Sequence, residues 1–320
     1  MADIPMIKSI NDTEKRLVQL KQAVPTRGME RHPTILKDVS ELPIELQSPE
    51  VSRLAAGETI QDIISFPPQI QRGHHYVPRQ ALLFTPKKAI HLLASIWPGQ
   101  VPEVTQVKGS DLLYMEVTLI LLYGFLEIVA PGDQSPARLG AEFNLVAWDL
   151  LSRPVRQLLL SARTSQTSAK EHVSFSPSVK LAVDGLPLKF FNGVRIHGLL
   201  PGEQLEDLVF QPGTWEHRLV FFRRAILPNT LILLTSNYLV VIQEELEVSQ
   251  GWIITYIPRN AILNIQNQPC SQWNELSLQL ERAGQSAQPQ FRLTASAART
   301  WHDCWTRHGG QWQDLPGEPV

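Results

Sequence analysis

The stretch GETIQDIISFP at residues 57–67 recurs as GEQLEDLVFQP at residues 202–212, which is a shift of 145 positions. A second stretch, PRQALLFT at residues 78–85, recurs as PNTLILLT at residues 228–235, a shift of 150 positions. Two matched stretches in the same order, separated by slightly different lengths of chain, indicate a diverged tandem duplication. The sequence therefore predicts two units of the same fold.

Composition describes an ordinary globular protein. The chain has 320 residues, 43% of them hydrophobic and 19% charged, so it is long enough for two domains that each bury a core. The net charge of −2 argues against a general nucleic-acid binder, which carries a basic excess. The two cysteines indicate no disulfide framework, and we find neither a signal peptide nor a membrane span, so we expect a cytoplasmic protein.

Both copies open with a Leu-Pro phrase, at Leu42-Pro43 and Leu186-Pro187, and close with a predicted amphipathic helix, at residues 147–160 and 295–308. Apolar runs of strand length lie between these points. Five segments follow. They are an N-terminal appendage with a short helix (1–41), a first domain (42–165), a Ser-rich linker (166–185), a second domain (186–310) and a tail that looks frayed (311–320).

Each predicted unit has about six or seven strands followed by one helix. An open antiparallel sheet must protect its end, and an amphipathic helix with a large aromatic side chain can do so. The strands that end in ALLFT and LILLT, the turn after each and the terminal helix resemble pleckstrin-homology-like domains, in particular the bacterial short and GRAM types. The resemblance implies a mainly β fold with α: two units, each a bent antiparallel sheet or partly open barrel capped by a C-terminal helix.

In domains of this type, the connection after the first strand binds anionic headgroups. The residues that the resemblance places there or at the following turn are Arg72, His74, His75, Arg79, Lys87 and Lys88. Convergent Lys and Arg side chains favour phosphate groups. The alternative is an ordinary solvated loop, and the second copy favours it because Ser236 and Asn237 replace the two lysines. We expect Asn237 to adopt a positive φ in that turn.

Other side chains are candidates for binding sites. Trp97, Trp215 and Trp273 are predicted in loops, where large aromatics anchor interfaces or fold back as lids. Cys304 and His308 share a helix face, with His302 nearby, but a structural zinc site needs four ligands and no second pair is close in sequence, so we predict no metal. The acids kept in both copies, such as Glu203 and Asp207, are interpreted as turn or backbone caps.

The sequence contains no nucleophile elbow, phosphate loop or metalloprotease motif. We therefore expect a non-enzymatic binding or scaffold protein without a cofactor. Its partner would be a protein, bound at a sheet edge or in the groove between last strand and helix. The alternative is peripheral binding to an anionic membrane. An enzyme with a site between the copies is a third hypothesis without positive support. The sequence predicts neither the partner nor the oligomeric state.

Overall fold

The structure is a computed structural model that describes residues 33–57, 59–71, 75–97, 99–121, 123–163, 174–175, 177–219, 222–246 and 251–316. The predicted N-terminal helix, Arg72 and His74 lie outside these residues. The prediction of a mainly β chain with helices is confirmed, since antiparallel sheets dominate the described chain. Within these residues, no helix is long and apolar enough to cross a membrane.

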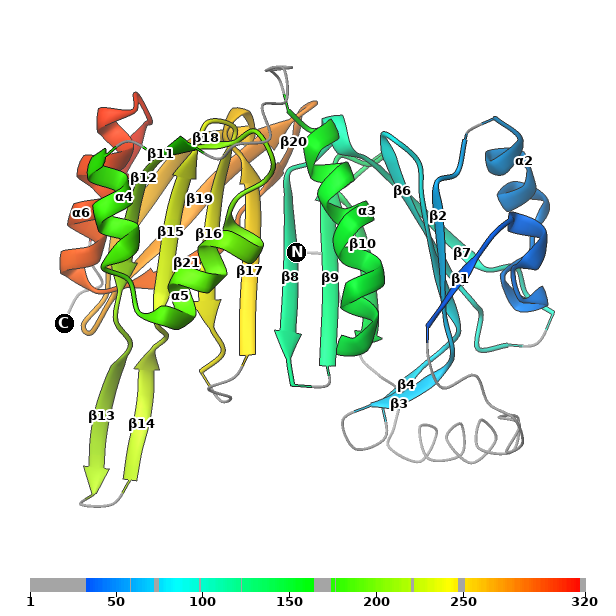
Figure 1. Cartoon of the computed structure of the whole chain (residues 1–320), viewed down its shortest axis with the longest axis horizontal. Coiled ribbons are helices and arrows are strands. Elements are labelled where there is room, and N and C mark those ends of the chain that lie inside the picture. Colours follow the sequence, from blue (N-terminus) through cyan, green and yellow to red (C-terminus); the bar gives the residue numbers. More distant parts are fainter. Residues whose placement is uncertain are drawn as a thin grey trace.

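Three large sheets hold most of the strands (Figure 1). The first has five strands in the order β1-β2-β5-β6-β7, the second has eight in the order β10-β9-β8-β17-β16-β15-β12-β11, and the third contains β20-β19-β18-β22 with β21 paired to β19. The first-sheet strands are β1 (Thr34–Leu36), β2 (Asp62–Phe66), β5 (Gln80–Phe84), β6 (Lys88–Leu93) and β7 (Glu103–Lys108). The second-sheet strands are β8 (Tyr114–Ile120), β9 (Tyr123–Ala130), β10 (Ala137–Asn144), β11 (Ser174–Phe175), β12 (Gln204–Gln211), β15 (Thr230–Thr235), β16 (Tyr238–Glu244) and β17 (Gly251–Pro258). The third-sheet strands are β18 (Ile262–Pro269), β19 (Asn274–Arg282), β20 (Gln285–Ala287), β21 (Gln290–Leu293) and β22 (Trp312–Asp314).

Two separate hairpins, five α-helices and several short 3₁₀ or π turns complete the regular structure of the described chain. The hairpins are β3 (Gln69–Gln71) with β4 (His75–Val77) and β13 (Thr214–Leu219) with β14 (Phe222–Leu227). The helices are α2 (Pro49–Gly57), α3 (Trp148–Ser161), α4 (Pro177–Asp184), α5 (Leu188–Gly193) and α6 (Ala295–Arg307). Figure 1 shows α2 at one end of the molecule, α6 at the other, and α3, α4 and α5 against the eight-stranded sheet.

The strand register reproduces the two shifts that the sequence repeat shows. β2 pairs with β5, and β12 pairs with β15, both antiparallel. The cross-strand pair Asp62–Phe84 corresponds to the pair Asp207–Leu234 in the second copy. In the same way, Ile64–Leu82 corresponds to Val209–Ile232, and Phe66–Gln80 corresponds to Gln211–Thr230. A shift of 145 positions on one strand and 150 on the other therefore carries each of these cross-strand pairs onto its counterpart.

The turns after β5 and β15 are held by the same threonine. Thr85 Oγ1 accepts the backbone N–H of Lys88 over 3.0 Å, and Thr235 Oγ1 accepts that of Tyr238 over 3.1 Å. Asn237 does not have the positive φ that we predicted; the only non-glycine residues with positive φ in the described chain are Leu121 and Ala283. Its side chain instead donates to the carboxylate of Glu203, which satisfies the turn without a left-handed residue.

Glu203 caps this turn, as the interpretation of the repeated acids requires. Its carboxylate accepts the backbone N–H of Asn237 over 3.0 Å and the hydroxyl of Ser236 over 2.9 Å. Only 1% of its side chain is exposed, and it forms an ion pair of 2.9 Å with Arg163, which follows α3. A buried carboxylate needs such partners because removing its charge from water is costly.

The two copies share one sheet and one core. β17 of the second copy pairs antiparallel with β8 of the first, which joins seven strands of the two copies, together with β11, into the eight-stranded sheet. The largest apolar cluster contains Leu126 and Val155 from the first copy and Leu231, Val240 and Ile254 from the second. Trp301 and Trp305 of α6 belong to a second cluster, and Leu46 and Val51 to a third that lies against the outer face of the first sheet.

Some elements differ from the sequence prediction. Residues 177–184 of the predicted linker form α4, because Val179 and Val183 are four apart and bury one helix face in the shared core. Strand β10 and the β13–β14 hairpin were not predicted, and the hairpin extends away from the sheets (Figure 1). The predicted tail includes β22, a strand of the third sheet.

Candidate functional site

Helix α6 lies between β12 and the third sheet and positions the candidate site. Thr294 caps its first turn by accepting the N–H of Ala297 over 3.2 Å. Its apolar side chains Ala298, Trp301 and Trp305 are buried in the second apolar cluster. The same face carries Cys304, so the C-terminal turns of α6 bring polar groups against β12.

The chain leaves α6 through two glycines and returns along the third sheet. Gly309 has φ of +78°, which favours glycine. A Cβ atom added to Gly310 would lie 2.1 Å from the ring of Trp305, so this position has no room for a side chain. The indole N–H of Trp305 donates to the carbonyl of Gln311 over 2.9 Å. The last helix thus directs the following residues onto β18.

Strand β22 adds to the edge of β18 in parallel orientation. Ile265, Gln266 and Asn267 lie opposite Trp312, Gln313 and Asp314. Backbone hydrogen bonds flank this pairing, from Ile265 N–H to the Gln311 carbonyl over 3.1 Å and from Leu315 N–H to the Asn267 carbonyl over 2.8 Å. An extended segment of chain therefore occupies the sheet edge beside α6.

Few side-chain contacts hold β22. The ring of Trp312 meets His302 edge to face, with centroids 5.0 Å apart. The carboxylate of Asp314 accepts the amide N–H of Asn267 over 2.8 Å and the indole N–H of Trp312 over 3.0 Å. These two hydrogen bonds lower the pKa of Asp314. Gln313 and Asp314 are exposed, whereas half-buried Trp312 packs against the second apolar cluster, so β22 contacts the core through one side chain.

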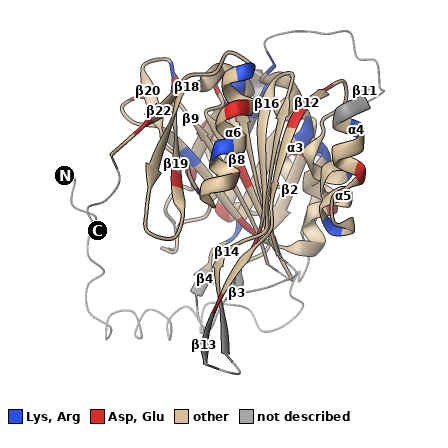
Figure 2. Cartoon of the chain, turned by 90° about the vertical axis from the view of Figure 1, so that its left-hand side faces the viewer, with Lys and Arg blue, Asp and Glu red and all other residues tan. Residues whose placement is uncertain are grey.

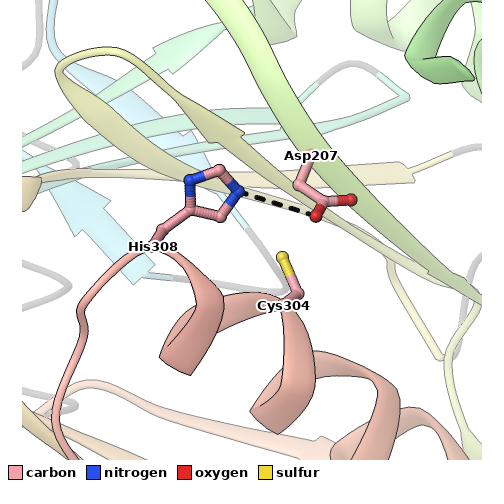
Figure 3. Close-up of side chains that lie close together, drawn as sticks. All are labelled: Asp207, Cys304 and His308. Carbon is pink, nitrogen blue, oxygen red and sulfur yellow. Dashed lines mark ion pairs between the residues drawn. The ribbon is translucent and has the colours of Figure 1, made fainter.

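Beside β22, three potential metal ligands lie within 4.8 Å of one another: Asp207 on β12, and Cys304 and His308 from α6 and its C-cap (Figure 3). Asp207 is the member that the sequence analysis did not place here. Its Oδ2 lies 3.7 Å from Nε2 of His308 and 3.1 Å from Nη1 of Arg307. The structure does not bring His302 into this cluster, since its ring faces Asp303 and Trp312.

The arrangement of Asp207, Cys304 and His308 does not activate the cysteine as a nucleophile. A catalytic thiol needs a histidine within hydrogen-bond reach and a carboxylate behind the histidine. Here Asp207 is the hydrogen-bond partner of the thiol, and His308 Nε2 lies 3.7 Å from the same carboxylate instead of beside the sulfur. Burial, and next the Asp207 carboxylate, raise the pKa of Cys304 well above its usual range. The thiol is therefore protonated at neutral pH.

The predicted anion-binding residues do not converge in the described structure. Arg79 precedes β5, whereas Lys87 and Lys88 follow it, so they lie at opposite ends of a strand roughly 16 Å long. Arg79 Nε lies 3.7 Å from the carboxylate of Glu45. The backbone of His75 is in β4, and Arg72 and His74 lie outside the described residues.

The predicted interface tryptophans are in three separate places. Trp97 is 48% exposed and follows β6, near exposed Ile96 and Val101. Trp215 is 57% exposed and lies on β13 rather than in a loop. Trp273 is half-buried in the β18–β19 turn, where the guanidinium of Arg292 lies 4.9 Å from its ring. Loop position is thus confirmed for Trp97 and Trp273.

A pocket of about 620 Å³ lies between β1, the residues after it, α2 and β2. Its titratable residues are Lys37 and Asp38, and it does not touch the seam between the copies. It therefore does not have the convergent groups that an active site at the junction requires.

No protein-family model matches the chain, and no curated protein is significantly similar to it. The function is therefore inferred from the geometry of the chain alone.

Proposed function

We propose that the chain is a protein-binding scaffold of two pleckstrin-homology-like units, and that it binds an extended segment of its partner at the β18 edge, where β22 lies in this structure. The occupancy of this edge by β22 supports the proposal, because it demonstrates an edge and a neighbouring helix that accept an extended segment. Strand addition of this kind gains affinity from backbone hydrogen bonds and specificity from alternate side chains.

The unequal lengths of the two strands also support exchange. β18 has eight residues, and β22 pairs with three of them. A partner segment that pairs along more of β18 would form more ladder hydrogen bonds than β22 does. Releasing β22 exposes the half-buried part of Trp312 and little other apolar surface, because its other two side chains are already exposed. The free energy of displacement is therefore small compared with that of unfolding.

The contacts of β22 indicate the chemistry of the partner segment. An aromatic side chain at the position of Trp312 would meet the ring of His302. An acidic side chain two residues later would accept the amide N–H of Asn267, as Asp314 does. Residues i and i+2 of a strand point to the same side. We infer that the partner contributes an extended aromatic-x-acidic sequence.

The similar arrangement of the two copies supports the assignment to pleckstrin-homology-like units. Each has four antiparallel strands, a short turn, further antiparallel strands and a helix that lies against the first strand of its own copy, β2 for α3 and β12 for α6. In the first copy the strand equivalent to β18 is β8, and β17 already covers it. Among the described strands, the edge of β18 beside α6 is therefore the member of this equivalent pair that a strand of the other copy does not cover.

Binding to an anionic membrane is the alternative. Its main support is Lys87 in the β5–β6 turn and Lys88 at the start of β6. On the side of the molecule that carries α6, basic and acidic residues are interspersed (Figure 2). This distribution favours the protein-binding function for that side, because membrane attachment gains from a surface of one sign.

The test is capture at the proposed edge. A photo-crosslinking residue replaces Leu263 on β18, which is 50% exposed, and a matched one replaces Val146, which is 61% exposed and lies in the first copy. We expect a protein of the native host to crosslink at position 263 but not at 146, at a peptide with the aromatic-x-acidic pattern. Equal capture at both positions, or capture of lipid only, would overturn the proposal.

A further inference from the structure

We propose that Asp207, Cys304 and His308 bind a Zn²⁺ ion, a site that is separate from strand exchange at β18. The three side chains come from two elements that meet only in the folded chain: Asp207 from β12, and the other two from the end of α6. Figure 3 shows all three side chains directed toward one another.

The separations of the donor atoms fit a metal ion. Donors at 2.0–2.3 Å from a tetrahedral Zn²⁺ lie roughly 3.3–3.8 Å apart. Asp207 Oδ2 and His308 Nε2 are 3.7 Å apart, and all three donors lie within 4.8 Å of one another. Side-chain rotations that shorten the longest separation by about 1 Å would bring all three onto one ion. Two of the donors are half-buried, so the ion is accessible to solvent.

A second carboxylate sets the histidine for metal binding. Glu206 Oε2 lies 3.3 Å from Nδ1 of His308, and Arg259 Nη1 lies 2.7 Å from the same oxygen. A carboxylate can only accept, so in this contact it favours a proton on Nδ1, and Nε2 is left on the side of Asp207 and Cys304. Histidine ligands of zinc are oriented in this way by an outer carboxylate.

The charges around the cluster are compatible with the replacement of the Cys304 thiol proton by Zn²⁺. Glu206 and Asp207 are balanced by Arg259 and Arg307. When Zn²⁺ binds, the Cys304 thiol releases its proton to solvent, and a thiolate, an imidazole and a carboxylate become its ligands. The side chain of Arg307 is 67% exposed and is free to move away from Asp207. A thiolate and an imidazole favour zinc over calcium or magnesium, and water completes four-coordination.

The experiment measures binding of Zn²⁺ alone to the full chain by equilibrium dialysis with elemental analysis, and of Co²⁺ by absorption spectroscopy. We expect one ion per chain and a thiolate-to-Co²⁺ charge-transfer band. Cys304→Ser removes the band, and Asp207→Asn and His308→Gln weaken Zn²⁺ binding. Glu206→Gln keeps all three ligands but lowers the affinity roughly 10–100-fold.

The matched controls are Cys270→Ser, at the other cysteine, and His302→Gln, on the same helix outside the cluster. Both should bind Zn²⁺ as the wild type does. Far-ultraviolet circular dichroism of each metal-free variant shows whether it is folded, and Asp207→Asn is the variant that least disturbs the core. The proposal is overturned if the folded wild-type chain binds no stoichiometric Zn²⁺, or if Cys270→Ser loses as much affinity as Cys304→Ser.

Discussion

The indole N–H of Trp305 donates to the backbone carbonyl of Gln311 over 2.9 Å. A core residue of α6 thereby fixes the path of the chain just before β22. Gly310 lies against the same ring, at a distance that leaves no space for a side chain. The helix that closes the second copy and the strand that covers β18 are therefore coupled through one aromatic side chain.

Gly310→Ala tests this coupling. Its new Cβ would lie 2.1 Å from the Trp305 ring, so either the tail or the indole must move. We expect a loss of about 1–3 kcal/mol in the free energy of unfolding, together with faster hydrogen exchange of the Leu315 amide. Gly57→Ala is the control, because nothing lies within 4 Å of its added Cβ. Equal, small effects of both variants would show that Gly310 does not direct the tail.

Glu203→Ala tests the buried turn cap. The change removes an acceptor for Ser236 and Asn237 and leaves the Arg163 guanidinium, 12% exposed, without its carboxylate. We expect the free energy of unfolding, measured with urea, to fall by about 3–5 kcal/mol. Glu275→Ala, which removes a more exposed ion pair with Arg292, should cost less than about 1 kcal/mol. Similar losses in both variants would contradict the role of Glu203.

His91 predicts how stability depends on pH. Burial lowers its pKa to about 4, and its Nε2 lies 3.0 Å from Oε1 of buried Gln80. The unfolded chain has the ordinary pKa of about 6.5, so between pH 6.5 and 4 it binds more protons than the folded chain does. The contribution of neutral His91 to the free energy of unfolding is thus complete above pH 6.5. As the pH falls toward 4, this contribution is lost, and it amounts to on the order of 3 kcal/mol.

The measurement is urea unfolding of the wild type and His91→Gln from pH 4.5 to 7.5. Glutamine retains a donor for Gln80 but does not titrate. The wild type should lose more stability than the variant as the pH falls. Parallel curves for the two proteins would show that His91 is not held neutral.

The shared core predicts a single unfolding transition. Ile254 of β17 lies opposite Val117 of β8, and both are buried in the cluster that contains residues of both copies. Ile254→Ala should lower the free energy of unfolding by about 2–5 kcal/mol and should leave calorimetric unfolding as one transition, because the largest apolar cluster contains residues of both copies. Two separated transitions in the wild type would show that the copies fold independently.

The repeat was readable from sequence because it lies in apolar alternation and turn chemistry. Thr85 and Thr235 mark equivalent turns, and the strands before them keep their cross-strand register. The helix caps at Ser48 and Thr294 were also predictable, since a hydroxyl followed by a helical pattern identifies them locally. These features depend on residues that are neighbours in the chain.

The site could not be predicted because it depends on contacts between distant segments. Asp207 precedes Cys304 by nearly a hundred positions, and only the packing of α6 on β12 brings them together. β22 is three residues long and mostly exposed, so it has no apolar alternation that distinguishes it from a tail. The pairing of β17 with β8 likewise has no local signal, since strands of this length pair with many partners.

Exchange of β22 at the β18 edge is tested by the variant Gln313→Pro. Proline has no N–H to give to the ladder, and Gln313 is exposed, so the change weakens β22 without touching the core. Gln313→Ala keeps the backbone donor and is the matched control. The probe is a labelled peptide with the sequence of residues 311–316, titrated by fluorescence anisotropy.

The tethered strand competes with the peptide at an effective concentration of roughly millimolar, so the wild type and Gln313→Ala should bind it weakly. Gln313→Pro should bind it at least about tenfold more tightly, and a scrambled peptide should not bind. Equal affinity of the peptide for Gln313→Pro and Gln313→Ala would contradict strand exchange at β18.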